Sequence, residues 1–432
     1  MVNIHYTQNW FQFYLVTVLT LVVVGNTFGG NVNPRPELYL PNYKVYHNIS
    51  SLQKEINKLI SKFPNYLQLD HRYVSRKSIS QFVLHLKNFS QSGRTQSVLS
   101  SKKPKVLLSF GEHAREFFPV ESALYFIKNI TSGLQKPHGS PQQKFSSTIL
   151  SKLDIIIVAL ANPDGRQLIE KTENYCWRGT STGVDLDRNF NWNFGGKGSS
   201  SDPLDEEYRG RSPLSEPECE VYLELTEHHQ FEAFVSFHSG IRQVYIPYAD
   251  SISAKEKRVP DNKEVQLKLA KLLAESTPQS FQFGLGYDLN EYPADGTIYD
   301  YMHGVKKIPF SLTIELWGEG DSKDKKCFDL FNPPSEHLQV ALEGVMPIYE
   351  RLLSFLIDWK EQNMHQHYHS LEQPELSLPK SYMFPVLAVS VLLLVIFHRH
   401  LPVSLRGYQR RRVVSLRSLS STFAAGGGVK IT

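Results

Sequence analysis

The first 30 residues of this 432-residue chain contain no aspartate, glutamate, lysine or arginine. Within them, residues 11–24 form a mostly apolar run that is followed by several glycines. This run of 14 residues is short for a membrane-spanning helix and fits the hydrophobic region of a secretory signal peptide. We therefore predict a signal peptide at 1–30. An uncleaved N-terminal anchor is the alternative, because no basic residue precedes the run.

Cysteine is scarce, with only Cys176, Cys219 and Cys327 in the whole chain. Three cysteines can form at most one disulfide, so an oxidising compartment would leave one thiol over. The pairing cannot be read from the sequence, and of the three possibilities we expect Cys176 with Cys219.

Acidic residues are absent from the C-terminal tail at 398–432, which contains seven basic residues. Subtracting these seven positive charges from the formal net charge of +4 leaves −3 for the rest of the chain. Since the basic excess belongs to the tail alone, nucleic-acid binding has no support. By the positive-inside rule, such a tail is typical of a cytoplasmic flank.

An uncharged apolar run at 382–397 lies between Lys380 and this tail. Its 16 residues are slightly few for a bilayer, but a snorkelling lysine would lengthen the span. We therefore predict one transmembrane helix at 382–397, a polar stalk at 361–381 and a cytoplasmic tail at 398–432. A buried C-terminal helix is the alternative. A lipid-anchor signal fits less well, because its hydrophobic tail should end the chain.

Three N-x-S/T sequons, at Asn48, Asn88 and Asn129, lie between the two apolar runs. Such sequons mark acceptor sites for glycans on a lumenal domain. The sequence thus predicts a glycosylated, single-pass type I membrane protein of the secretory pathway, with its main domain lumenal or extracellular.

The segment 31–360 reads as one domain in which helical and strand patterns alternate. Apolar residues recur at helical spacing in two segments, and short apolar runs mark two buried strands: 52–63 and 120–130 for the helices, 154–160 and 309–315 for the strands. This alternation predicts an α/β fold with a mixed, mostly parallel central sheet and helices on both faces. Residues 195–214 are rich in Gly, Ser, Asp and Pro and predict a long loop.

Residues 215–218 have the spacing of a capping box, in which a serine and a glutamate three residues later cap a helix start. They precede an apolar periodic segment at 220–229, which we therefore expect to be a helix.

Two short stretches contain side chains that could bind a metal: Gly-Glu-His113-Ala-Arg-Glu116 and Ser-Phe-His238-Ser-Gly. Two imidazoles and one carboxylate are the set that a catalytic zinc uses when its fourth position is open to water. Each stretch follows an apolar run, so both sets of ligands should lie where a buried strand ends. The His-x-x-Glu spacing alone arises by chance in a chain with 16 histidines, and two capped or surface residues at a helix start would also explain it.

Further motifs resemble those of the zinc metallocarboxypeptidases, the family of the pancreatic carboxypeptidases and their regulatory relatives. The resemblance covers about residues 43–355, and the motifs occur in the family's order. They are Asn162-Pro-Asp-Gly165, Trp177-Arg178, Gly183-Val-Asp185-Leu-Asp187-Arg188-Asn-Phe190, Ser215-Glu-Pro-Glu218, Phe237-His238-Ser239 and Thr313-Ile-Glu315-Leu316.

The resemblance implies a role for each residue of a catalytic site. His113, Glu116 and His238 would hold one zinc ion, and Asp185 would hydrogen-bond a ligand histidine. Glu315 would be the general base that takes a proton from a zinc-activated water. The implied catalytic arginine is Arg178, which would polarise the scissile carbonyl and stabilise the oxyanion.

The resemblance also implies that the substrate is the C-terminus of a peptide or protein. Arg188 would bind the terminal carboxylate, with Asp187 beside it, and Arg115 would line the subsites behind the cleaved bond. Tyr292 matches the tyrosine that closes over the C-terminal residue. By its position, Tyr299 forms the floor of the pocket for the C-terminal side chain.

Several positions depart from the family pattern. Asp187 replaces the usual asparagine and would repel an anionic chain end unless it pairs elsewhere, and Gly240 replaces a frequent tyrosine. We expect no propeptide, because the family-like segment begins directly after the signal region. A neutral floor at Tyr299 favours neutral side chains, although Asp250 lies one position from where a basic-preferring branch places an acid.

Two alternative functions stay open at this point. The chain could be a catalytically weak, membrane-tethered peptide-binding protein on the same fold, for which Asp187 and Gly240 would be signs of drift. It could also be a related zinc amidohydrolase, although Arg178, Arg188 and Tyr292 favour the carboxypeptidase.

Overall fold

The structure is a computed structural model that describes residues 37–91, 103–290, 292–319, 326–372 and 380–400. The predicted signal peptide and nearly all of the predicted tail lie outside these residues. By its internal contacts the chain divides after Glu361 into two units.

The central sheet of the first unit has eight strands among the described residues, in the order β1-β2-β4-β3-β5-β8-β6-β7. Four neighbouring pairs are parallel (β4 with β3, β3 with β5, β5 with β8 and β6 with β7), and the other three are antiparallel. The strands are β1 (Leu67–Asp70), β2 (Val83–Leu86), β3 (Lys105–Phe110), β4 (Asp154–Val158), β5 (Ala233–Gly240), β6 (Arg242–Ile246), β7 (Gln282–Leu285) and β8 (Phe310–Gly318).

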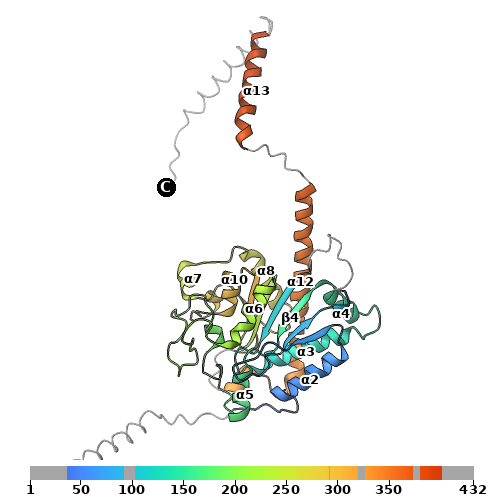
Figure 1. Cartoon of the computed structure of the whole chain (residues 1–432), viewed down its shortest axis with the longest axis vertical. Helices are drawn as coiled ribbons and strands as arrows, with labels where there is room; N and C mark the ends of the chain where they lie inside the picture. The colour runs from blue at the N-terminus through green and yellow to red at the C-terminus, as the bar shows by residue number, and fades with distance from the viewer. Residues whose placement is uncertain (1–36, 92–102, 291, 320–325, 373–379, 401–432) are drawn as a thin grey trace, which may run out of the picture. The chain divides into compact units, whose positions relative to one another are not determined.

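Both faces of the sheet are buried. Alternate strand residues point to opposite faces, and the residues of each face pack in a different apolar cluster. Val106 and Leu108 of β3 belong to one apolar cluster, whereas Leu107 belongs to another. Helices therefore cover both faces, as the sequence predicted (Figure 1). The first cluster includes residues of α2 (Ile49–Lys62), α3 (Phe117–Gly133), α4 (Pro141–Lys152), α5 (Pro163–Thr172), α8 (Lys263–Ala274), α11 (Cys327–Phe331) and α12 (Leu338–Glu372), and the second includes residues of α6 (Glu220–His228) and α10 (Ile298–Gly304).

Two short helices, α7 (Ser251–Glu256) and α9 (Gly286–Leu289), complete the unit, and 195–214 contains no helix or strand. The capping box predicted at 215–218 is wrong. A 3-10 turn at Pro217–Cys219 leads into α6, whose N-cap Cys219 makes no side-chain cap bond. The Ser215 hydroxyl instead accepts a hydrogen bond from Asn189, so a tertiary contact replaces the local cap.

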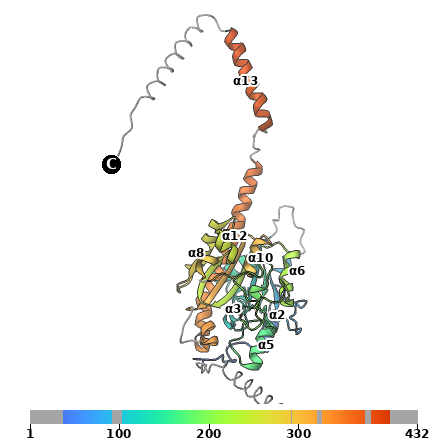
Figure 2. The same ribbon diagram turned by 90° about the vertical axis from the view of Figure 1, so that its left-hand side faces the viewer.

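The C-terminal region differs from the sequence-based expectation in two ways. Helix α12 continues to Glu372, so the first part of the predicted stalk is helical (Figure 2). The run at 382–397 lies in α13 (Lys380–His400), but no helix of the described residues is long and apolar enough to cross a membrane. The predicted span is therefore not supported. The run of 16 residues is shorter than the roughly 20 that a bilayer requires.

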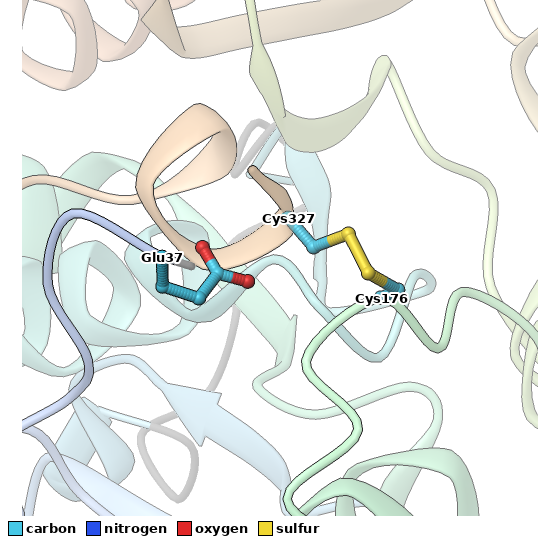
Figure 3. Close-up of side chains that lie close together, drawn as sticks. All are labelled: Glu37, Cys176 and Cys327. Carbon is cyan, nitrogen blue, oxygen red and sulfur yellow. A yellow bond between two sulfur atoms is a disulfide. The ribbon is translucent and has the colours of Figure 1, made fainter. Parts of the chain in front are cut away.

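The disulfide joins Cys176 to Cys327, whose Cα atoms are 4.8 Å apart, and Cys219 is a buried free thiol. The predicted pairing of Cys176 with Cys219 is thus wrong, because folding brings the start of α11 against the loop after α5. Figure 3 shows this disulfide beside Glu37. The Glu37 carboxylate accepts backbone N–H groups of α11, and sulfurs that are bonded to each other offer no thiolate to a metal.

Loss of this disulfide is expected to destabilise the domain, because the bond closes a loop of 151 residues. We expect Cys327→Ser to lower the free energy of unfolding by about 2–5 kcal/mol. Denaturant unfolding with and without reductant measures this effect. Reductant should destabilise the parent and a Cys219→Ala control alike and leave Cys327→Ser unchanged. A parent protein that is indifferent to reductant would contradict the prediction.

Candidate active site

The sheet brings the predicted site residues together at the carboxyl ends of three adjacent parallel strands. β3 lies beside β5, with Phe110 opposite Phe237, so the loop after β3 meets the end of β5. β5 lies beside β8, and their register places His238 directly opposite Glu315. Apolar strand residues thus fix where the polar side chains emerge, at the sheet edge where α/β proteins usually bind ligands.

Buried hydrogen bonds hold the loop that contains the first two ligands. Asn162 Nδ2 donates to the carbonyl of Glu112 at 3.1 Å, and the guanidinium of Arg166 donates to the carbonyls of Ala114 and Glu116 at 2.9 and 3.0 Å. The Arg166 guanidinium also stacks on Phe117, 3.6 Å from the ring centroid. The Asn162 motif and the arginine that follows it therefore fix the backbone of the ligand loop.

The side chains of the three predicted metal ligands converge, and both histidines direct their Nδ1 atoms toward the Glu116 carboxylate. His113 Nδ1 lies 2.7 Å from Glu116 Oε1 and 3.0 Å from His238 Nδ1, and His238 Nδ1 lies 3.1 Å from Glu116 Oε2. Donor atoms around a tetrahedral zinc are about 3.3 Å apart. These buried donors therefore fit zinc in number, chemistry and spacing.

Asp185 holds His113 from the side opposite the metal position. Its Oδ1 lies 3.1 Å from His113 Nε2, and its Oδ2 accepts a hydrogen bond from Arg178 Nε at 2.8 Å. Burial alone would raise the pKa of Asp185, but Arg178 and His113 hold it well below its usual range. An ionised Asp185 accepts a hydrogen bond from the Nε2–H group of His113. The Nδ1 atom of His113 then has no proton and is free for a metal.

A second carboxylate, which sequence reasoning missed, holds the other ligand histidine. Glu112 Oε2 lies 2.9 Å from His238 Nε2. Its signal in the sequence was a charged residue placed two positions after the apolar run of β3, between a buried strand and the first ligand. That signal identifies an unusual residue but not its partner, which comes from a different strand.

Glu315 projects from β8 beside the ligands, and its Oε2 has no hydrogen-bond partner among the described residues. Burial, followed by the negative charge of Glu116, raises the pKa of Glu315 to about 7. A carboxylate with one free oxygen next to a metal site, and with a pKa near neutrality, can accept and return a proton.

A cleft of about 750 Å³ opens at these residues. It is lined by every site residue predicted from the sequence except Asp185, which lies behind His113. The predicted residues that line it are His113, Arg115, Glu116, Arg178, Asp187, Arg188, His238, Tyr292, Tyr299 and Glu315.

Two acidic residues of the 195–214 loop, also missed from the sequence, pair with the arginines of the cleft. Glu206 accepts a hydrogen bond from Arg115 at 2.7 Å, and Glu207 accepts one from Arg188 at 3.0 Å. The Nε of Arg188 is buried and has no partner among the described residues. The Nε donor of Arg188 is therefore free for a ligand, while Glu207 partly neutralises the charge of the guanidinium.

Asp187 is turned toward the protein backbone. Its Oδ1 accepts the N–H of Ile298 at 3.0 Å, while Oδ2 lies 3.7 Å from Arg188 Nη1. Burial raises the pKa of Asp187 above its usual value. Oδ1 of Asp187 is thus bound to the backbone, and the distance from Oδ2 to Arg188 is too long for a hydrogen bond.

Neutral groups form the part of the cleft around Tyr299, with Ala249 and Thr313 among the lining residues. Asp250 does not line the cleft. Both of its oxygens are occupied, Oδ2 by Trp192 Nε1 at 2.8 Å and Oδ1 by the first backbone N–H groups of α7. Asp250, which left a preference for basic C-terminal side chains open in the sequence, therefore caps helix α7 instead.

Gly240 provides room for an aromatic side chain from another element. A Cβ at Gly240 would lie 2.9 Å from the ring of Phe331, and that ring stacks under Arg115 at 4.3 Å from centroid to guanidinium. Gly240 lacks the family's tyrosine side chain, and the ring of Phe331 lies against it and lines the cleft.

The chain is similar to known carboxypeptidases in sequence. The zinc carboxypeptidase family model matches residues 56–347. Human (Homo sapiens) carboxypeptidase A1 is 30% identical over 332 residues, which cover 72% of this chain and 71% of the relative. Mouse (Mus musculus) carboxypeptidase A4 is 27% identical over 332 residues, which cover 73% of this chain and 72% of the relative.

Solved structures show the same fold. The crystal structure of thrombin activatable fibrinolysis inhibitor matches with a TM-score of 0.61 at 21% identity, over 73% of this chain and 75% of that chain. Carboxypeptidase A from Helicoverpa armigera matches with a TM-score of 0.60 at 21% identity, over the same shares. Together with the sequence similarity, these matches confirm the predicted enzyme class and zinc as its cofactor. The family model matches well over half of this chain, and the chain therefore belongs to the zinc carboxypeptidase family.

Proposed function

We propose that this enzyme removes C-terminal residues from peptides or proteins, with Glu315 as the general base. The observation that carries the proposal is the pairing of β5 with β8, which sets Glu315, whose Oε2 has no hydrogen-bond partner among the described residues, opposite the ligand His238. A base within reach of a metal site, in a cleft that also contains arginines for a carboxylate, suits hydrolysis at a chain end.

When bound by His113, Glu116 and His238, zinc supplies a Lewis acid that polarises a carbonyl and makes water more acidic. Glu315 accepts a proton from the attacking water and returns it to the nitrogen of the leaving amine. Arg178, held by Asp185, donates hydrogen bonds to the oxygen on which negative charge develops.

Arg188 selects a chain end. Its buried, unpaired Nε donates to the terminal carboxylate of the substrate, and a planar guanidinium suits that partner. One N–H of Nη2 already binds Glu207, so the substrate shares Arg188 with a protein carboxylate. Arg115 and Phe331 line the subsites on the other side of the cleaved bond, and Tyr292, which is 58% exposed, covers the C-terminal residue.

The peptide-binding alternative gains no support from the two departures that suggested it. Asp187 bonds to the backbone, and Gly240 makes room for Phe331. A protein that only binds peptides has no need for Glu315 or for a complete set of zinc ligands, so hydrolysis accounts for more of the site. The arginines of the cleft equally favour a peptide chain end over the small substrates of an amidohydrolase.

The preferred C-terminal side chain is neutral in this proposal. Tyr299 approaches Gly286 so closely that no Cβ fits there, and Asp250 is occupied as the cap of α7. The cleft near Tyr299 therefore offers a basic side chain no counter-charge from either residue.

We also propose that the enzyme works in the secretory pathway or outside the cell. The Cys176–Cys327 disulfide supports this location, because such bonds persist in oxidising compartments. The sequons at Asn48, Asn88 and Asn129 support it as well, since all three side chains are partly exposed.

One assay tests the proposed activity. The purified full chain is given the same peptide with a free or an amidated C-terminus, with and without a chelator. We expect release of the C-terminal residue from the free peptide only, and loss of that release with chelator. Binding of the free peptide without cleavage, with zinc present, would instead support the peptide-binding protein.

Asp187→Asn should improve the binding of free-carboxylate peptides only modestly, by on the order of 1 kcal/mol or less. The reason is that Asp187 Oδ1 is already bonded to the backbone N–H of Ile298, and an asparagine oxygen can accept the same bond. Values of KM or Ki for a free and an amidated peptide measure this effect. A gain of several kcal/mol, or equal cleavage of amidated peptide by the parent, would show that Asp187 faces the substrate.

A further inference from the structure

Glu112 is a buried glutamate that the proposed mechanism does not use. Only 1% of its surface is exposed, and it lies between the end of β3 and the ligand His113. Its side chain points away from the metal position, toward hydroxyl groups of β3 and β5 and the far side of His238. It is therefore not one of the three ligands, yet it contacts one of them directly.

The hydrogen bonds around Glu112 all run toward its carboxylate. The Ser109 hydroxyl donates to Oε1 at 2.5 Å, and the Ser236 hydroxyl donates to Oε2 at 2.7 Å. The Ser109 oxygen in turn lies 2.5 Å from the hydroxyl of Tyr222, which can supply its proton to it. Each oxygen of the Glu112 carboxylate thus accepts a hydrogen bond from a hydroxyl group.

These bonds determine which nitrogen of His238 bears the proton. His238 Nε2 lies 2.7 Å from Ser236 Oγ and 2.9 Å from Glu112 Oε2. Because the Ser236 hydroxyl donates to Glu112, Nε2 of His238 faces two acceptor oxygens and its single N–H is shared between them. His238 is then the Nε2–H tautomer, and its Nδ1, which faces His113 and Glu116, is left without a proton for the metal.

The charges of the two carboxylates behind the ligand histidines are balanced differently. Asp185, behind His113, also pairs with Arg178. In contrast, the only ion-pair partner of Glu112 among the described residues is His238. A buried carboxylate without a lysine or arginine needs another positive charge nearby. A metal ion bound to His238 would supply that charge.

We propose that Glu112 is a positioning residue that fixes the tautomer and ring orientation of His238 and so strengthens zinc binding. This inference rests on the proposed zinc-dependent function, but concerns metal affinity and not hydrolysis. Removal of a carboxylate that holds a ligand histidine typically weakens metal affinity by about 10–100-fold. In this chain both ligand histidines have such a partner, and that of His238 comes from the residue next to the first ligand.

The test compares the zinc dissociation constants of the full-length parent and a Glu112→Gln variant, by competition with a chelator of known affinity. Glutamine keeps the size and removes the charge, so we expect zinc to bind about 10–100-fold more weakly. Glu218→Gln is the matched control. Glu218 is also fully buried, but its side chain contacts the backbone of Arg76 and neither ligand histidine, and its zinc affinity should equal that of the parent.

A second readout separates positioning from general stabilisation. In the zinc-loaded parent, the Nε2 proton of His238 should give a strongly downfield NMR signal that Glu112→Gln shifts or abolishes and Glu218→Gln retains. If Glu112→Gln does not fold, Ser236→Ala replaces it and should weaken zinc binding by a smaller factor.

Unchanged zinc affinity in Glu112→Gln, or in Ser236→Ala where that variant is used, would overturn the proposal. Equal weakening in Glu218→Gln would overturn it too, because the effect would then be one of buried charge in general. A parent that binds no zinc would refute the proposed function instead, and a parent that binds zinc without cleaving peptides leaves the affinity test intact.

Discussion

Glu315→Gln is expected to lower kcat by roughly 10²–10⁴-fold while the zinc content and the fold stay those of the parent. Glutamine has the size of glutamate but cannot accept the proton of the attacking water. The Oε2 atom of Glu315 has no partner among the described residues, so the substitution breaks no hydrogen bond at that atom. Steady-state kinetics on a free-carboxylate peptide, with metal analysis of the same sample, measures both quantities.

The pH profile gives this prediction a second readout. A general base must be deprotonated, so activity should rise with pH through the pKa of Glu315 and be lost as pH falls below it. Burial and Glu116 raise that pKa to about 7 in the protein alone, and a bound cation favours the charged form. The acidic limb of kcat/KM should therefore lie at or below about pH 7, and it should vanish from the residual activity of Glu315→Gln. Parental turnover in this variant, or an unaltered acidic limb, would remove Glu315 as the base.

His238→Ala should abolish stoichiometric zinc binding and with it the activity, by roughly 10³-fold or more, because a catalytic metal contributes several kcal/mol to the stabilisation of the transition state. The variant keeps only His113 and Glu116, three residues apart on one loop, and loses the one ligand that β5 provides. Metal analysis after dialysis, together with peptidase kinetics, measures the outcome.

His228→Ala is the matched control, because this exposed histidine lies at the end of α6, and its one side-chain hydrogen bond among the described residues is to a backbone carbonyl of its own helix. It should retain zinc and activity. Undiminished zinc in His238→Ala would exclude the assigned ligand set.

The positions of the candidate ligands and of Glu315 at one edge of the sheet could be predicted from the sequence because their signals are local. An apolar run that ends in a polar motif fixes both a buried strand and the edge at which its next residues lie. His113 and His238 each follow such a run, and Glu315 lies within one. The alternation of these runs with helical segments also predicted the covered, mixed sheet.

What could not be predicted depends on contacts between distant segments. The partner of Glu112 is on β5, and the partners of Arg115 and Arg188 are on a loop without periodicity. The disulfide partner of Cys176 lies 151 residues away, and no local pattern selects it over Cys219. Asp250 seemed close to the substrate pocket because spacing gives a position along the chain, whereas α7 turns its carboxylate into a cap.

The order of the strands has a consequence for how the enzyme comes into being. β8 is the last strand of the described sheet in the sequence, yet it lies in the middle, between β5 and β6. A growing chain can pair β3 with β5 and bring all three zinc ligands together, but β6 and β7 can join the sheet only when β8 is inserted. Non-local pairing of this kind is slow, because the entropy of closing the loop must be overcome first. Glu315 arrives on that same strand, so the proposed base joins the three candidate ligands only in the step that completes the sheet.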